Sequence, residues 1–258
     1  MNIVSVDPNK RNVLVPLFAE HVTERIFIKS ILDGHTGIAL VDSKTDPQVA
    51  QLTFGRWAIF GGDATHPVAH QLVQQLSRAW VTPVSEVWRE LMFQVHGHHL
   101  KQTHGITFSP QSLNLEHLQN LQKQVPSDCQ IERVDIPLAN RLRNEGFASF
   151  KGFSSFANFV ERGVGFCATI KGCIVSYAVS TMQCREGIEI GIGTHPDFRN
   201  KGFATAVGAT LLVHCIERDI YAHWSTGYEN SISIRLAEKL GYVRQAVCET
   251  LGVPIQAL

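Results

Sequence analysis

The chain has 258 residues, which is enough for one large domain or two modest domains with their own cores. Hydrophobic residues make up 44% of the chain and charged residues 18%, as in ordinary globular proteins. Because the formal net charge is zero, the composition gives no sign of binding to nucleic acid or to a membrane surface. We find no signal-peptide pattern and no apolar stretch long enough to span a bilayer, so we expect a cytoplasmic protein.

Cysteine and histidine positions bear on redox state and metals. The six cysteines form no CxxC pair, and without a secretion signal we expect reduced thiols, most of them buried. A histidine cluster follows residue 95 and comprises His96, His98, His99 and His104. Its spacing matches no helical ligand pair and no cysteine joins it, so we expect a polar loop and no metal.

The first half of the chain predicts an α/β domain. Asp7-Pro8 is typical of a helix start, and apolar residues then follow a helical spacing, with breaks, through Val13, Leu17, Phe18, Val22, Ile26 and Ile31. Strand patterns cover 37–42 and 56–63, and helical patterns cover 66–80, 83–95 and 113–125. Trp80 and Trp88 fall at helical spacing and are expected in the core. No internal repeat at a fixed period is found.

The second half predicts the order β-α-α-β-β-β-α-β-α-β, a mixed α/β layer. Lys171-Gly172 is a hairpin signal between two apolar strands within 163–183, and Gly241 ends the last helix. The other expected strands cover 131–136, 188–194 and 219–226 and begin again at Tyr242, and the helices cover 137–145, 154–161, 200–218 and 230–240. Because Pro126-Ser127-Asp128 separates the halves, we expect a smaller N-terminal α/β domain over 1–126 and a C-terminal mixed sheet flanked by helices over 130–258.

The segment R-N-K-G-F-A, from Arg199 to Ala204, lies between an expected strand and an expected helix. A helix N-terminus has free N–H groups and a partial positive charge, which favour a bound anion. Gly202 has no Cβ to keep an anion away, and Arg199 and Lys201 add cationic donors. The segment therefore predicts a diphosphate site. It contains no GxxxxGK[ST], and the third glycine of the dinucleotide fingerprint is missing.

R-x-x-G-x-A after a strand resembles the acetyl-CoA pyrophosphate loop of the GNAT superfamily of N-acetyltransferases. E-I-G-I-G-T-H-P-D-F-R over 189–199 resembles the family's fourth strand, and N-x-x-S-x-x-L-A-E-K-L-G-Y over 230–242 resembles its closing segment. The resemblance covers about residues 130–258, and the two-part plan is similar to the branch that includes the zwittermicin-resistance acetyltransferase. It implies transfer of an acetyl group from acetyl-CoA to the primary amine of a small molecule, without a metal. The N-terminal domain then shapes or covers the acceptor site, or is a decayed second acetyltransferase fold.

The resemblance also assigns roles to residues. Those expected to bind the cofactor are Ile192, Gly193, Thr194, Arg199, Asn200, Lys201, Gly202, Phe203, Ala204, Thr205, Asn230 and Ser233. Alternation along the strand puts the isoleucines of 188–192 on one face and Glu189 on the other. A carboxylate there is expected to take the proton of the acceptor amine, directly or through a water. The other interpretations are a surface glutamate paired with a cation and a glycine bulge in an ordinary strand. Asn230 is also expected to cap a helix, a role that can hold together with cofactor contact.

The general acid is the open point. The family often has a tyrosine seven residues after the asparagine, and here that position is Ala237. Tyr228 is the nearest replacement in the sequence and Ser233 is another, whereas Tyr242 is expected in the core. Coenzyme A thiolate is also a fair leaving group without an acid. Two other functions stay open, a protein or peptide N-acetyltransferase and a non-catalytic acyl-CoA sensor, and the sequence fixes neither the acceptor nor the oligomeric state.

Overall fold

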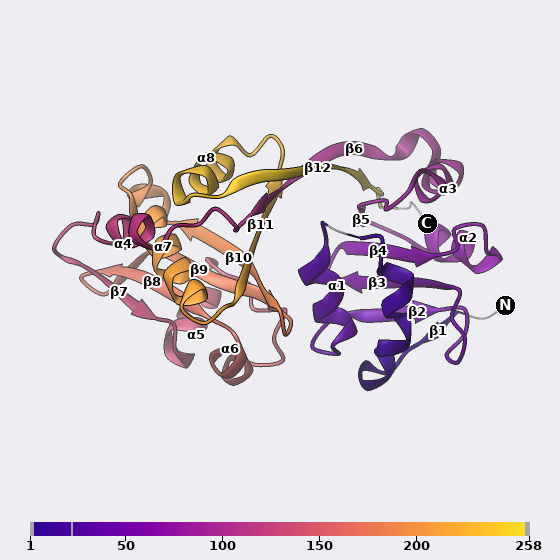
Figure 1. Cartoon of the computed structure of the whole chain (residues 1–258), viewed down its shortest axis with the longest axis horizontal. Coiled ribbons are helices and arrows are strands. Elements are labelled where there is room, and N and C mark those ends of the chain that lie inside the picture. Colours follow the sequence, from indigo (N-terminus) through magenta and orange to yellow (C-terminus); the bar gives the residue numbers. More distant parts are fainter. Residues whose placement is uncertain (1–2, 22, 256–258) are drawn as a thin grey trace. The chain divides into compact units, whose positions relative to one another are not determined.

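The computed structural model describes residues 3–21 and 23–255 (Figure 1). Val22, which the sequence places on the first helical pattern, lies outside the described residues. The chain folds into two compact units. The first unit is Met1–Gly105 with Val247–Leu258, and the second unit is Ile106–Ala246.

This division differs from the expected boundary at 126–130, and packing gives the reason. Leu118 and Leu121, from the helix before that boundary, are buried in the core of the second unit. Leu251 and Val253, near the end of the chain, are buried in the core of the first unit. The chain therefore passes between the units twice, once within each of two strands.

The first unit has helices on both faces of a sheet whose strands run in the order β1-β2-β3-β4-β5-β12. Its elements are β1 (Val4–Ser5), η1 (Pro8–Phe18), α1 (Arg25–Leu32), β2 (Ile38–Val41), β3 (Val49–Phe54), β4 (Trp57–Gly62), α2 (Pro67–Gln74), β5 (Trp80–Val81), α3 (Glu86–His96), η2 (Gly97–His99) and the start of β6 (Lys101–Ser109). One core lies under η1 and α1 and the other under α2 and α3. Alternate residues of β4 separate into these two cores, as the period of a strand requires.

The second unit has the strand order β6-β11-β10-β9-β8-β7. Its elements are the end of β6, α4 (Leu115–Gln122), β7 (Cys129–Arg133), α5 (Ile136–Asn144), α6 (Phe156–Arg162), β8 (Gly165–Ile170), β9 (Cys173–Gln183), β10 (Gly187–Thr194), η3 (Pro196–Phe198), α7 (Phe203–Ile216), β11 (Tyr221–Gly227), α8 (Ser231–Leu240) and the start of β12 (Val243–Gly252). The expected order β-α-α-β-β-β-α-β-α-β is confirmed from β7 to β12.

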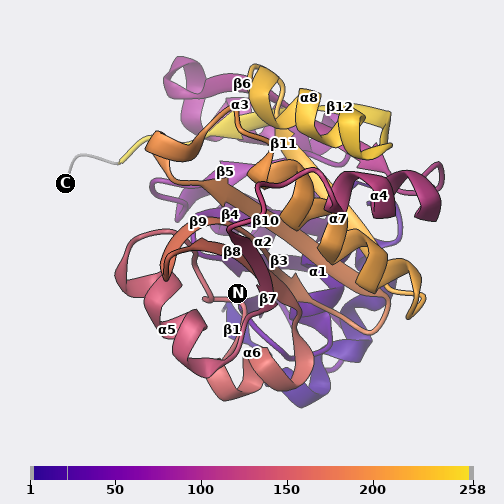
Figure 2. The same ribbon diagram turned by 90° about the vertical axis from the view of Figure 1, so that its left-hand side faces the viewer.

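Helices cover both faces of the second unit's sheet. Helices α4, α7 and α8 pack over one core, and α5 and α6 pack over a second core on the opposite face (Figures 1 and 2). Ile188, Ile190 and Ile192 of β10 lie in the core under α7, so Glu189 points to the face of α5 and α6. The expected two-faced pattern of this strand is confirmed.

The two units repeat one element order, and a second acetyltransferase fold is one of the two expectations for the N-terminal half. Apart from the three-residue helices η2 and η3, the first unit reads β-η-α-β-β-β-α-β-α-β from β1 to β6, and the second reads β-α-α-β-β-β-α-β-α-β from β7 to β12. In each unit the strand before the third helix pairs in parallel with the strand after it. The repeat is one of secondary-structure elements rather than of amino-acid sequence, so no fixed period marks it in the sequence.

Several element boundaries differ from expectation. The helix predicted over 66–80 ends at Gln74, and Trp80 pairs in β5 with Trp57 instead of continuing the helix. Only Trp88 of the two tryptophans is fully buried, at 2% exposure. The segment expected as a polar loop around the histidines runs into strand β6. Only the start of β6 is polar and exposed, whereas its end contributes Ile106 and Phe108 to the core.

Candidate active site

Strands β10 and β11 begin as a parallel pair and then separate. The paired residues are Gly187 with Tyr221, then 188 with 222, and finally Glu189 with His223. Strand β10 continues to Thr194 and β11 to Gly227, in a stretch that the structure describes fully, without further pairing between them. The split lies at the carboxyl ends of two parallel strands joined through α7, where open α/β sheets commonly bind ligands.

Beyond the split, successive residues of β10 turn their backbone groups alternately toward β9 and toward the gap. The N–H of His195 donates to the carbonyl oxygen of Val175 at 2.9 Å, which makes 195 with 175 a hydrogen-bonded pair between the ends of β10 and β9. Since such pairs alternate in an antiparallel ladder, Gly193 also turns its backbone groups toward β9. Ile192 and Thr194 therefore turn theirs toward the split. Of the three strand residues expected to bind the cofactor, these two present backbone groups to the gap and Gly193 does not.

The two glycines of β10 have a packing reason as well. A Cβ on Gly191 would lie 2.5 Å from Cγ2 of Thr181, and one on Gly193 would lie 2.6 Å from the ring of Tyr177. Both side chains come from the neighbouring strand β9. The pairing with β9 also shifts register between Glu189 and Ile190. Side chains of β9 thus cross over both glycines, which favours the interpretation of an irregular strand for these glycines themselves.

The N-terminus of α7 lacks a side-chain cap. Its N-cap residue is Gly202, with φ +85° in the left-handed region, and among the described residues no side chain caps the first turn. Asn200 also has a positive φ of 61°. Lys201 is exposed, donates to the carbonyl oxygen of Asp197 at 3.0 Å and lies over the Phe198 ring. Phe203 is buried in the core, so only its backbone faces the helix end. These features fit a diphosphate, because free N–H groups and cationic side chains occur together.

Glu189 is held by two residues of β11. The parallel register places His223 beside it on the same face, and Ser225 is two residues further along that face. His223 Nδ1 contacts Oε2 of Glu189, and Ser225 Oγ donates to Oε1 at 2.8 Å. The side chain of Glu189 is 21% exposed and that of His223 is 7% exposed. Glu189 is therefore a half-buried carboxylate, and each of its two oxygens contacts one side chain of β11.

Sequence reasoning missed His223 and Ser225. Tyr221, His223 and Ser225 alternate with buried residues in the segment D-I-Y-A-H-W-S-T, so one polar face of this strand was visible. A strand-helix-strand unit usually places its two strands side by side, which would have brought this face to that of Glu189. Only the register, however, selects His223 as the partner.

The residues around the start of α8 have contacts within the fold. Asn230 is the N-cap of α8, since its Oδ1 accepts from the N–H of Ser233 at 3.2 Å. The hydroxyl of Ser233 accepts from Trp224 Nε1 at 3.1 Å. Tyr228 is 48% exposed in the turn that precedes α8, and Ala237 is fully buried. Tyr242 is buried and donates to the carbonyl oxygen of Ala222 at 2.8 Å, which confirms its expected place in the core.

The histidines of the cluster lie on three successive elements. His96 is buried at the end of α3 and its Nε2 lies 2.9 Å from the carbonyl oxygen of Val73. His98 and His99 follow in η2, and His104 lies on β6. Among residues 3–21 and 23–255, no group of three or more histidine, cysteine, aspartate or glutamate side chains has a metal-binding arrangement.

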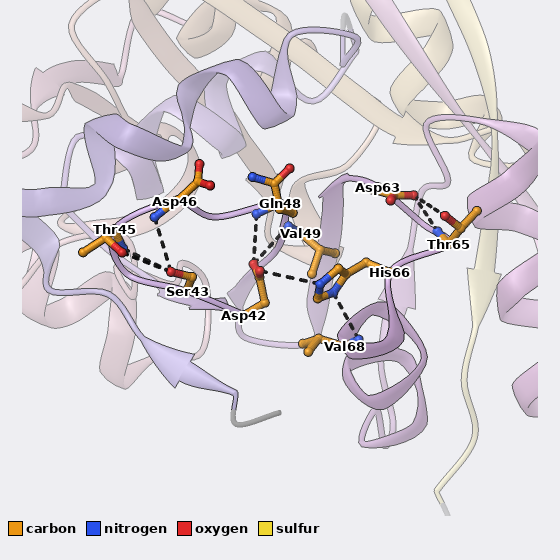
Figure 3. A network of polar contacts seen from close by, with 10 residues as sticks. All are labelled: Asp42, Ser43, Thr45, Asp46, Gln48, Val49, Asp63, Thr65, His66 and Val68. Atoms are coloured by element: carbon orange, nitrogen blue, oxygen red, sulfur yellow. Dashed lines mark hydrogen bonds and ion pairs between the residues drawn. The ribbon is translucent and has the colours of Figure 1, made fainter.

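The loop of the first unit that corresponds to the α7 entrance differs in chemistry (Figure 3). Trp57 and Gly187 are the first residues of β4 and β10 in the parallel pairs. Helix α2 begins at Pro67, ten residues after Trp57, whereas α7 begins at Phe203, sixteen residues after Gly187. His66 caps α2 by accepting from the N–H of Val68, and Pro67 has no N–H to offer. The hydroxyl and backbone N–H of Thr65 keep the pKa of Asp63 below its usual value.

Comparison with known proteins identifies the family of this chain. The model of the GNAT acetyltransferase family matches residues 15–250. The chain is 24% identical over 159 residues to the uncharacterized N-acetyltransferase YdfB of Bacillus subtilis, covering 61% of this chain and 59% of that protein. The match thus spans about three fifths of the length of this relative.

Solved structures share the fold over the whole chain. A GCN5-related N-acetyltransferase-like protein from Streptococcus suis has a TM-score of 0.80 and 24% identity, covering 96% of this chain and 99% of its own. A tandem GNAT protein from the clavulanic acid biosynthesis pathway has a TM-score of 0.65 and 12% identity, covering 100% and 99%.

The fold and the extent of the family match define the class of protein: this chain belongs to the GNAT acetyltransferase family. Its expected assignment to that superfamily is confirmed, as is the mixed α/β fold class. Over the part of the chain that the structure describes, no helix is both long enough and apolar enough to cross a membrane.

Proposed function

We propose that the protein is an acetyl-CoA-dependent N-acetyltransferase that acts on the primary amine of a small molecule. The observation on which this depends is the position of Glu189. It is the last paired residue of β10 before the split from β11, and its carboxylate lies on the face opposite α7. We also propose a cytoplasmic location, because all six cysteines, which lie within the described residues, are thiols rather than disulfides.

In this proposal acetyl-CoA is a substrate that supplies its acetyl group as a thioester. The free N–H groups at the start of α7, with Arg199 and Lys201, would bind its diphosphate. Asn200, Gly202, Ala204 and Thr205 would line that site through their backbone. The backbone of Ile192 and Thr194 would bind the pantetheine arm in the split.

Glu189 would remove the proton that a protonated amine must lose before it can attack a thioester. The N–H of Ile192, which turns toward the split, would stabilise negative charge that develops on the thioester oxygen. Tyr228 is our candidate for the acid that protonates the leaving thiolate, because it is exposed near the α8 end of the site. Ser233 is the other candidate, since its hydroxyl accepts from Trp224 Nε1 and keeps its own O–H to donate.

The test is an acetyl-transfer assay with wild type and Glu189→Gln, using a panel of small primary amines and a matched panel of peptides. We expect turnover with a small amine, and a loss of kcat on the order of 100-fold or more in the variant. The Kd for acetyl-CoA should stay within about threefold, because the glutamine keeps the size of the side chain.

Three outcomes contradict parts of the proposal. Turnover only with peptides overturns the small-molecule acceptor. Unchanged kcat in Glu189→Gln removes Glu189 from the reaction. Tight binding of acetyl-CoA without turnover on any amine favours a non-catalytic acyl-CoA sensor.

A further inference from the structure

We propose that His223 and Ser225 are positioning residues that hold the Glu189 carboxylate in one orientation for proton transfer. This inference depends on Glu189 being the base, as proposed above. It concerns two side chains on β11 that touch Glu189 and that no comparison singles out. Neither residue needs to contact acetyl-CoA or the amine.

Each oxygen of the Glu189 carboxylate has its own partner on β11. Ser225 Oγ donates to Oε1 of Glu189, and His223 Nδ1 contacts Oε2. An ionised carboxylate only accepts hydrogen bonds, so Nδ1 must bear the proton in this contact. Two donors from one strand, each on a different oxygen, restrict the carboxyl group far more than one would.

The Glu189 carboxylate keeps acceptor sites for a substrate or a water. Each carboxylate oxygen has two acceptor sites, so each can still accept one hydrogen bond from an amine or a water. Positioned groups of this kind lower the cost of reaching the reactive geometry.

The His223 ring is held in place by the residues around it. His223 is 5% exposed, and its ring stacks on that of Tyr221 with centroids 6.4 Å apart and planes 20° from parallel. The residues on either side, Ala222 and Trp224, are buried in the core under α7. The imidazole therefore has little freedom to leave Glu189, and the contact is partly shielded from water, where a charge-assisted hydrogen bond is stronger.

The alternative is that His223 itself takes up the proton from Glu189. His223→Asn and His223→Leu separate the two roles, because the side chains are close in size. The asparagine N–H can replace Nδ1 as a donor but cannot titrate, whereas leucine has no donor. In the acetyl-transfer assay we expect His223→Asn to keep kcat within about fivefold of wild type. We expect His223→Leu to lose on the order of 30- to 100-fold, and Ser225→Ala about tenfold.

In all three variants the KM for acetyl-CoA should change by less than about threefold, since none of them touches the α7 entrance. A second readout does not depend on turnover. In the proton NMR spectrum of the full chain, the His223 Nδ1–H should give a low-field signal that disappears in His223→Leu and shifts upfield in Glu189→Gln.

Equal loss of kcat in His223→Asn and His223→Leu would overturn the positioning role, since it would require a titrating imidazole. Wild-type kcat in His223→Leu, with Glu189→Gln inactive, would also overturn it while the proposed function stands. If wild type acetylates no amine, the proposed function fails first and this role fails with it.

Discussion

At the scale of single residues, the Glu189 carboxylate is positioned by the strand that carries it and held by the strand beside it. Alternation in I-E-I-G-I puts it on the face opposite the isoleucines. Its partner His223 lies 34 residues further along the chain. No local pattern fixes such a pair, because the partner depends on the register between β10 and β11.

Two other residues expected at the cofactor site have structural contacts that differ in how far the sequence predicts them. Asn230 caps α8, as the simple interpretation predicted. Gly193 is covered by the ring of Tyr177, a contact from the next strand that the spacing of glycines does not reveal. The cap follows from the residue type at the start of a helix, whereas the contact over Gly193 depends on the neighbouring strand.

Buried thiols allow a prediction at this scale. Burial raises the pKa of Cys167 and of Cys215 to about 12. A thiol is the reactive thiolate only above its pKa, so at pH 8 about one in 10⁴ of these groups would be ionised. Cys173, in contrast, is exposed. We expect a thiol reagent to label Cys173 first in the folded protein at pH 8, as read by peptide mass spectrometry.

In denaturant all six cysteines should react, which serves as the control. Labelling of Cys215 as fast as Cys173 in the native protein would contradict the packing of α7 on the sheet, because Cys215 lies on that helix.

At the scale of elements, the segment β10-α7-β11-α8 was predictable because its strands alternate, its helices have clear ends and its loop has an anion-binding composition. The helix expected over 66–80 was not, since apolar residues continue at helical spacing beyond its end at Gln74. There Arg78 adopts a positive φ of 52°, and Trp80 pairs with Trp57. Pairing with a distant strand outweighed the local helical pattern.

The start of α7 gives a stability prediction. Gly202 has φ +85°, a conformation that costs an alanine about 1–2 kcal/mol and an asparagine less. A Cβ there would lie 3.3 Å from the carbonyl oxygen of Gln124 in either variant, so that contact cancels in a comparison. We expect Gly202→Ala to lower the free energy of unfolding by about 1 kcal/mol relative to Gly202→Asn, measured by urea denaturation.

Equal stability of the two variants would show that residue 202 is not held in the left-handed region. The helix would then start differently from the structure, and the anion site proposed at its N-terminus would lose its geometry.

At the scale of the whole molecule, the repeated element order raises the question of whether each unit binds acetyl-CoA. The register of β4 with β5 makes Ile59 the counterpart of Glu189, and Ile59 is buried in an apolar core. The loop before α2, residues 63–66, is four residues shorter than the loop before α7, residues 195–202, and it lacks the two cations and the glycine. Asp63 places a carboxylate there instead, and Pro67 removes an N–H. These differences predict one cofactor site per chain, in the second unit.

The measurement that tests this account most directly is a calorimetric titration of acetyl-CoA into wild type, Gly202→Asn and Gly202→Asp. The two variants match in size and differ in charge. We predict one site per chain with micromolar affinity, a binding free energy of about −8 kcal/mol. Gly202→Asp should bind at least about tenfold more weakly than Gly202→Asn, because its carboxylate repels a diphosphate. Two sites per chain, or equal affinity in the two variants, would contradict the placement of the cofactor at the N-terminus of α7.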